Sequence, residues 1–163
     1  MDSKQLADLI ITPVLKFLEL YSKEAARLIL FTSATESLCG HYLRQIGKSG
    51  YGPARGIYQC ELNTFEDVTN FINTNNNLKT LIDYLKVPGM EDITNLTINP
   101  AFSTAICRVH YLRIKEGLPD YNDIDGIWNY YKKYYNSFLG KATKDKFIEN
   151  INVTKAINIS FEG

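Results

Sequence analysis

The sequence predicts an α+β domain that is predominantly α-helical, with a small β or irregular insert after its central helix. Apolar residues recur at helical spacing along most of the chain, whereas residues 38–59 lack this spacing and are rich in glycine. The chain has 163 residues, of which 45% are hydrophobic, and this is enough for one hydrophobic core. Neither an internal repeat nor a linker divides it, so we expect residues 1–163 to form a single domain.

The first helical segments lead to a carboxylic acid. Residues 4–20 have a helical pattern that Pro13 interrupts, which predicts two short helices or one kinked helix. Ser22 is a suitable cap for the next helix. In that helix Glu36 follows Ala25 by about three turns, so its side chain returns to the same face. We therefore expect a carboxyl group on the buried side of this helix.

Turn and capping residues predict the insert and the later helices. Pro53 fixes one turn of the insert, and a short β-ribbon is expected within residues 38–59, particularly around Arg55–Cys60. Further helices are predicted from Asn63 or Thr64, from Leu78, from Asn99 and Pro100, from Asp123 through Phe138 to Gly140, and from Thr143.

The charges of the chain cancel. Eighteen basic residues balance eighteen acidic ones, so we expect no broad attraction to nucleic acid or to an anionic membrane.

The first apolar run is short and is broken at Thr12 and Pro13, and we therefore expect neither a signal peptide nor membrane insertion. If such a protein acts outside a cell, another component must carry it there.

Glu36 is the main candidate for chemistry. A carboxylate on an apolar helix face costs several kcal/mol unless it finds partners, so it tends to keep its proton. A carboxyl group that is neutral near pH 7 is what a glycosidase needs to protonate a leaving glycosidic oxygen. The alternative is a structural Glu that bonds a backbone amide, or Arg44 or Arg55.

Two motifs in this region resemble those of a known family. Glu36 and Ser37, a glycine-bearing loop, and then the segment Gly-Ile-Tyr-Gln at 56–59 resemble the lytic transglycosylases of the lysozyme superfamily. In that family, which includes the SLT and goose-type lysozyme-like domains, a Glu-Ser pair precedes a Gly-Leu-Met-Gln-like segment. Looser similarities follow in the family's order at 95–112, and at 127–130, where the family has Ala-Tyr-Asn.

The resemblance covers residues 25–140. It implies a lysozyme-like fold, in which residues 1–21 would be an N-terminal helical extension and residues 141–163 a C-terminal helix and tail. It also implies peptidoglycan glycan strands as the substrate and requires no cofactor.

The resemblance further implies a mechanism with one catalytic residue. Glu36 would protonate the bond between N-acetylmuramic acid and N-acetylglucosamine, and would then take the proton of the C6 hydroxyl as a 1,6-anhydro ring closes. Ser37 would orient the acetamido group, and Gln59 with Tyr58 would line the groove. Tyr130 is the expected tyrosine that holds Glu36 and contacts substrate, with Tyr131 and Tyr134 as alternatives at a shifted register.

Two rival functions remain open. A hydrolytic muramidase would use a second acid, for which Glu61 and Asp67 are the candidates. A lysozyme-like virion structural or adaptor protein would keep the fold without activity. Because the family occurs in bacteria and bacteriophages, the resemblance places the protein in a phage virion or, after delivery, in the host periplasm or cell wall. Its partners would then include tail, baseplate or ejected virion proteins.

Two further groups of residues have a structural interpretation as well as a functional one. An aromatic cluster could stack on sugar rings or could fill the core. Its members are Trp128, Tyr130, Tyr131, Tyr134 and Tyr135. Cysteines and histidines are also present, without the tight pairs of a structural zinc site, so no metal site is predicted. These are Cys39, His41, Cys60, Cys107 and His110.

Overall fold

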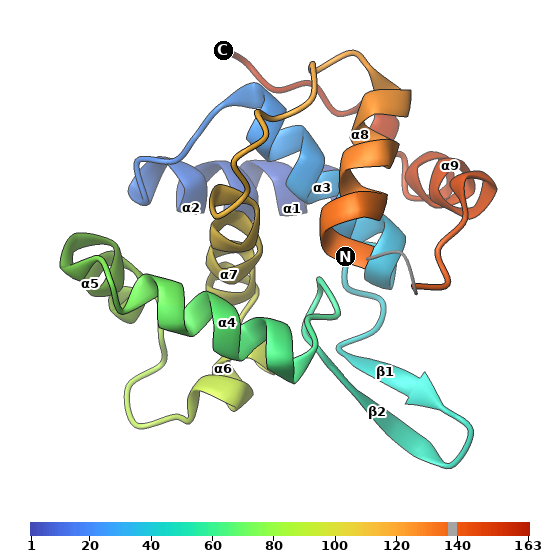
Figure 1. Ribbon diagram of the computed structural model, residues 1–163. Coiled ribbons are helices and arrows are strands. Elements are labelled where there is room, and N and C mark those ends of the chain that lie inside the picture. The colour runs from blue at the N-terminus through green and yellow to red at the C-terminus, as the bar shows by residue number, and fades with distance from the viewer. Residues whose placement is uncertain (137–139) are drawn as a thin grey trace.

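The computed structural model describes residues 1–136 and 140–163 and confirms a predominantly α-helical α+β single domain with one small two-stranded sheet in this part of the chain (Figure 1). The expected helical residue Phe138 lies outside the described residues. None of the helices formed by the described residues is long and apolar enough to cross a membrane.

The elements follow one another in this order: α1 (Ser3–Leu6), the π-helical turn η1 (Ala7–Ile11), α2 (Thr12–Phe17), α3 (Lys23–Ser37), β1 (Arg44–Gly47), β2 (Gly50–Arg55), α4 (Leu62–Ile72), α5 (Asn76–Tyr84), α6 (Asp92–Ile98), α7 (Pro100–Leu112), α8 (Ile124–Tyr131), the π-helical turn η2 (Lys132–Asn136), α9 (Lys144–Val153) and the 3-10 turn η3 (Ala156–Asn158).

Helices α3 and α7 form the centre of the domain. Every residue of α3 from Ala25 to Ala34 is buried, and so is every residue of α7 from Phe102 to Tyr111. A helix that is buried on all sides needs neighbours all round. Elements α2, α4, α6 and η2 contact α7, whereas α1, α8, α9 and η3 contact α3. A buried hydrogen bond of 2.8 Å between the hydroxyls of Thr32 and Tyr111 joins the two central helices.

The N-terminal segment is one helix with a wide turn, which corresponds to the kinked form expected from Pro13. Proline has no N–H to donate to the carbonyl of Leu9, and the backbone widens into η1 immediately before it. Leu6, Ile11 and Leu15 are fully buried. This segment is therefore part of the main core and not an appendage to it.

Four of the expected helix starts are confirmed by their capping bonds. The side-chain oxygens of Ser22, Asn99, Asp123 and Thr143 each accept the backbone N–H of the residue three positions later. An oxygen at this position satisfies one of the free amides of the first helical turn. The capping residues in the sequence therefore predicted the starts of these helices correctly.

One expectation about an element boundary was wrong. Helix α4 begins at Leu62, before the expected caps Asn63 and Thr64, because an isolated bridge between Arg55 and Cys60 already brings the chain out of the insert. The expected β-ribbon within residues 38–59 is present: β1 pairs with β2, and Arg55 and Cys60, where the ribbon was chiefly expected, form an isolated bridge. Helix α6 was not anticipated, because its seven residues are too few to show a helical period.

Gly56 fixes the insert against the helices. Its φ is +71°, and a Cβ there would lie 2.2 Å from the carbonyl oxygen of Leu96 and 2.6 Å from the hydroxyl of Ser103. Its N–H donates to the carbonyl of Leu43 at 2.9 Å. Both the backbone conformation and the close approach therefore require glycine.

We expect Gly56→Ala to lower the free energy of unfolding by about 2–4 kcal/mol, because alanine adds a left-handed strain and a backbone clash. Urea denaturation followed by circular dichroism measures this change. Gly117→Ala is the matched control, since nothing lies within 4 Å of its added Cβ. Equal stability of the two variants would contradict the assigned role of Gly56.

Candidate active site

Glu36 lies in the last turn of α3, where the chain reverses sharply. Leu38 and Cys39 both take left-handed conformations, with φ of 51° and 56°, and the Cys39 N–H bonds back to the carbonyl of Ser33 at 3.1 Å. This reversal sends the insert away from the helix end. The carboxyl group of Glu36 is therefore left facing a cleft and not the next turn of a helix.

The cleft has a volume of about 560 Å³, within the range of roughly 300–1,000 Å³ typical of ligand sites. Its walls come from the end of α3, the β-hairpin, the start of α4, the segment α8–η2 and the approach to α9. The lining residues are Thr35, Glu36, Gln45, Ala54, Gln59, Cys60, Glu61, Thr64, Tyr131, Tyr135, Asn136, Gly140, Lys141, Ala142 and Lys146.

Burial controls the protonation of Glu36. Loss of hydration and, to a smaller extent, the nearby charge of Glu61 together raise the pKa of its carboxyl from 4.5 to about 7. A hydrogen bond from Tyr131 opposes this shift, since it favours the carboxylate. Glu36 therefore keeps its proton through much of the neutral range.

Tyr131 holds the carboxyl group in place. Its hydroxyl donates to Oε1 of Glu36 at 2.5 Å. Burial and the charge of Glu36 raise the pKa of Tyr131, so this hydroxyl keeps its proton. With Oε1 engaged by Tyr131, the acidic proton of Glu36 belongs on Oε2. Oε1 therefore accepts a hydrogen bond from the protein, and the proton on Oε2 can be donated to a ligand.

The structure brings Tyr131, and not Tyr130, to Glu36. The hydroxyl of Tyr130 donates to the backbone carbonyl of Glu116 at 3.0 Å, and Tyr134 bonds the side chain of Glu116. Neighbouring residues on a helix point about 100° apart, so Tyr130 and Tyr131 cannot both reach the acid. The alternative register named for Tyr131 is the one that the structure adopts.

Gln59 lies in the cleft, as expected for a groove residue. Its backbone has a φ of 47°, and its side-chain amide nitrogen donates to the carbonyl of Gly56 at 2.8 Å. The amide oxygen has no hydrogen-bond donor among the described residues. It is therefore free to accept a hydrogen bond from a ligand.

Ser37 and Tyr58 do not line the cleft. Ser37 is buried, its hydroxyl donates to the carbonyl of Ile57 at 2.5 Å, and it accepts the N–H of Gly40 at 2.8 Å. Tyr58 is also buried and shares a hydrogen bond of 2.9 Å with Thr104. Both residues dock the 56–59 loop onto the helices. Like Tyr130, they lie outside the space that a substrate could reach.

One wall of the cleft was not predicted from the sequence. Lys141 and Lys146 belong to the segment expected to be only a C-terminal helix and tail, yet they line the same cleft as Glu36. The side chain of Asn150 fixes α9 to α3 by donating to the carbonyl of Thr35 at 3.1 Å. Contacts between residues more than a hundred positions apart in the chain create this wall, so no local motif predicts it.

The three cysteines and His110 are used in packing, whereas His41 is exposed. All three thiols, Cys39, Cys60 and Cys107, are buried. Burial raises the pKa of Cys39 to about 11 and that of Cys60 to about 12. His110 bonds the carbonyl of Tyr134 at 2.6 Å, and burial lowers its pKa. Over residues 1–136 and 140–163, no group of three such ligands could hold a metal ion.

The raised pKa of Glu36 predicts how stability depends on pH. Between its unfolded value of 4.5 and its folded value of about 7, the folded state binds more protons, so the free energy of unfolding falls as pH rises. Glu36→Gln removes this cost and should stabilise the protein by about 3 kcal/mol at pH 8, with the gain disappearing at about pH 4.

Urea denaturation at several pH values measures this difference. Glu66→Gln is the control, since Glu66 is exposed and lies outside the cleft. A gain from Glu36→Gln that stayed constant with pH would show that ionisation of Glu36 is not its source.

Comparisons of the chain with protein-family models, curated proteins and solved structures gave no match. The similarity of its motifs to a family therefore depends on the residues alone.

Proposed function

We propose that this protein is a peptidoglycan lytic transglycosylase that uses Glu36 as its single acid and base. The observation that carries the proposal is a carboxyl group with a pKa of about 7, held by Tyr131 and open to a cleft of about 560 Å³. The Glu36–Ser37 pair and the 56–59 segment supply the substrate class through their resemblance to that family.

In the first step Glu36 acts as an acid. The proton on Oε2 passes to the glycosidic oxygen between N-acetylmuramic acid and N-acetylglucosamine, and the bond from C1 to that oxygen breaks. The acetamido oxygen of the substrate stabilises the positive charge that develops at C1. The Tyr131 hydrogen bond supports the carboxylate that forms, since it favours the charged state of Glu36.

In the second step Glu36 acts as a base. Its carboxylate takes the proton of the C6 hydroxyl, and the C6 oxygen bonds to C1 to close a 1,6-anhydro ring. Glu36 ends the cycle protonated, as it began. The two reaction steps require neither water nor a protein nucleophile, so one acid is enough.

The rest of the cleft suits an anionic glycan. Gln59 offers a free amide oxygen to a sugar hydroxyl or amide, and Gln45 and Asn136 add further polar groups. Lys141 and Lys146 add positive charge to the lining, although Lys146 also pairs with Glu149 at 2.9 Å. Peptidoglycan carries carboxylates on its stem peptides and on lactyl groups without a peptide, and these are the groups that lysines would attract.

Glu61 gives specific support to a second candidate, a hydrolytic muramidase. It lines the same cleft and is close enough for its charge to raise the pKa of Glu36. A second carboxylate of this kind could activate a water molecule for direct hydrolysis. Asp67, the other acid considered for this role, is not among the lining residues.

The place of action remains part of the proposal. We infer from the motif resemblance that the protein is carried in a phage virion, beside tail, baseplate or ejected proteins, and reaches the peptidoglycan of the host through it. A lysozyme-like virion protein without activity is the corresponding rival.

Digestion of purified peptidoglycan, with mass analysis of the fragments, tests the proposed reaction. We expect 1,6-anhydromuramic ends from the wild-type protein and from Glu61→Gln, and a loss of at least about a thousandfold in rate for Glu36→Gln. Reducing ends that disappear in Glu61→Gln would establish the muramidase instead. Absence of fragments from the wild-type protein would favour the inactive rival.

Tyr131→Phe tests how the acid is held. Because the Tyr131 hydrogen bond lowers the pKa of Glu36, its removal should move the alkaline limb of the rate profile to higher pH while the maximum rate falls about tenfold. Tyr134→Phe is the control, since its hydroxyl bonds Glu116 and not Glu36. A Tyr131→Phe profile with an unmoved alkaline limb would leave Tyr131 only a packing role.

A further inference from the structure

The β-hairpin has two faces of different character. It projects from the helical body, as Figure 1 shows. Side chains alternate across a strand, and directly paired residues share a face. Gln45 and Ala54 line the cleft on one face. The pairs Arg44–Arg55 and Ile46–Tyr51 lie on the other face, which we call the outer face of the hairpin; the register shifts between the two pairs, and the contact of Arg44 with the Tyr51 ring shows that they still share this face.

Positive charge on the outer face has no acidic partner. Residues 38–60 contain Arg44, Lys48 and Arg55 but neither Asp nor Glu. Seven ion pairs occur in the described part of the chain, and none of them includes these three residues. In a chain of zero net charge, this stretch is therefore a local basic region.

The two arginines converge on one point. Nη2 of Arg44 and Nη1 of Arg55 both donate to the carbonyl oxygen of Gly52, at 2.9 Å and 3.1 Å, so the two nitrogens lie within 6.0 Å of each other. Like charges in a cross-strand pair repel, and loss of hydration, followed by the charge of Arg44, lowers the pKa of Arg55. The other donors of the two guanidinium groups make few bonds to the protein. An anion between them would relieve the repulsion and satisfy these donors.

Large apolar side chains lie beside this charge. Ile46 is 68% exposed and Tyr51 is 75% exposed, although they pair directly across the hairpin. The guanidinium carbon of Arg44 lies 5.4 Å from the centre of the Tyr51 ring. Tyr42 and Leu43, just before β1, are also exposed. Tyrosine and arginine next to an aliphatic residue are typical of surfaces that meet the headgroups of a bilayer.

We propose that the outer face of the hairpin binds the surface of a membrane that contains anionic phospholipids. Arg44 and Arg55 bind lipid phosphates, Lys48 adds charge, and Ile46 with Tyr51 enters the boundary between headgroups and acyl chains. The apolar pair favours a lipid surface over a soluble polyanion, which offers nothing to Ile46. The contact is peripheral, and it leaves the cleft on the opposite face of the hairpin open. This inference does not depend on the proposed glycan cleavage.

Vesicle binding by the full chain tests the proposal. We expect sedimentation with vesicles of phosphatidylcholine and phosphatidylglycerol, and little with phosphatidylcholine alone. Each basic residue near an anionic surface contributes about fivefold in partitioning, so Arg44→Gln with Arg55→Gln should weaken binding about 30-fold. Ile46→Ser with Tyr51→Ser should weaken it about tenfold or more. Higher salt should weaken binding by the wild-type protein.

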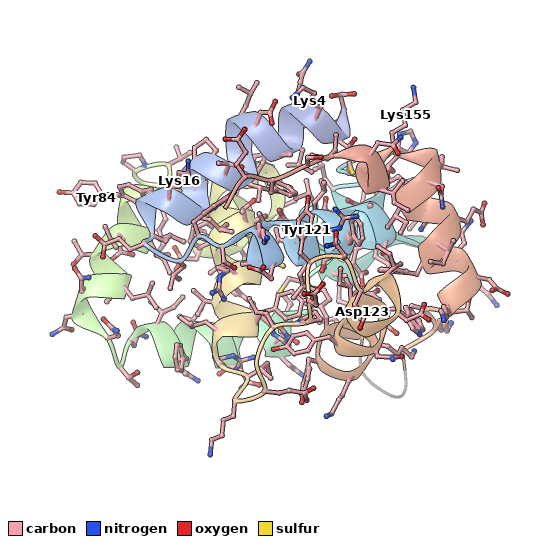
Figure 2. The ribbon with its side chains drawn as sticks, turned by 90° about the horizontal axis from the view of Figure 1, so that it is seen from above. Lys4, Lys16, Tyr84, Tyr121, Asp123 and Lys155 are labelled. Atoms are coloured by element: carbon pink, nitrogen blue, oxygen red, sulfur yellow. The ribbon has the colours of Figure 1, made fainter. Side chains whose placement is uncertain are left out.

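A charge-matched control distinguishes binding through the outer face of the hairpin from a general electrostatic attraction of the protein to anionic vesicles. Lys4→Gln with Lys155→Gln removes the same charge from side chains that point into solvent in Figure 2. It should bind vesicles like the wild-type protein, and an equal loss in this control would overturn the proposal. Equal binding to neutral and anionic vesicles, or to neither, would also overturn it.

Two further measurements locate the contact. Tyr51→Trp should show a blue-shifted emission with anionic vesicles and quenching by brominated acyl chains, and an unchanged emission would overturn insertion of the hairpin. Inorganic phosphate or soluble polyphosphate that binds to the wild-type protein, while vesicles do not, would assign the arginine pair to a small oxyanion or polyanion and overturn the membrane surface as its partner.

Discussion

The hydrogen bond from Tyr131 to Glu36 is the constraint around which the cleft is arranged. It joins residues 95 positions apart and ties α8 to the end of α3. A carboxyl group at the end of a buried helix loses hydration, and a fixed donor reduces the cost of its ionisation without removing it. The result is an acid that can change its charge near neutral pH. Position and pKa are thus two consequences of the same packing.

Much of the fold could be predicted from local patterns. Caps such as Ser22 and Thr143 located helices because a side-chain oxygen there replaces a missing backbone partner. The sequence also located Glu36 and Gln59 in one site, through helical spacing and a motif. It could not distinguish Tyr130 from Tyr131, since that choice depends on how α8 rotates against α3. Nor could it find Lys141 and Lys146, which reach the cleft only through long-range packing of α9.

Lysine and arginine have separate uses in this chain. The seven ion pairs of the described residues all use lysine. Arg44, Arg55 and Arg108 donate to backbone carbonyls, and Arg27 lies against the rings of Phe31 and Tyr121. A planar guanidinium group suits such contacts better than an ammonium group. Zero net charge therefore conceals an uneven distribution, in which every ion pair of the described residues uses a lysine and none uses an arginine.

The burial of all three native thiols has a practical consequence for spectroscopy. Cys39, Cys60 and Cys107 are enclosed, with pKa values raised by burial, so little reactive thiolate forms in the folded protein. A cysteine introduced on the surface would accordingly be the preferred target of a maleimide or nitroxide reagent, without prior removal of the native ones. Distances and mobilities could then be recorded by electron spin resonance or energy transfer with the core left intact.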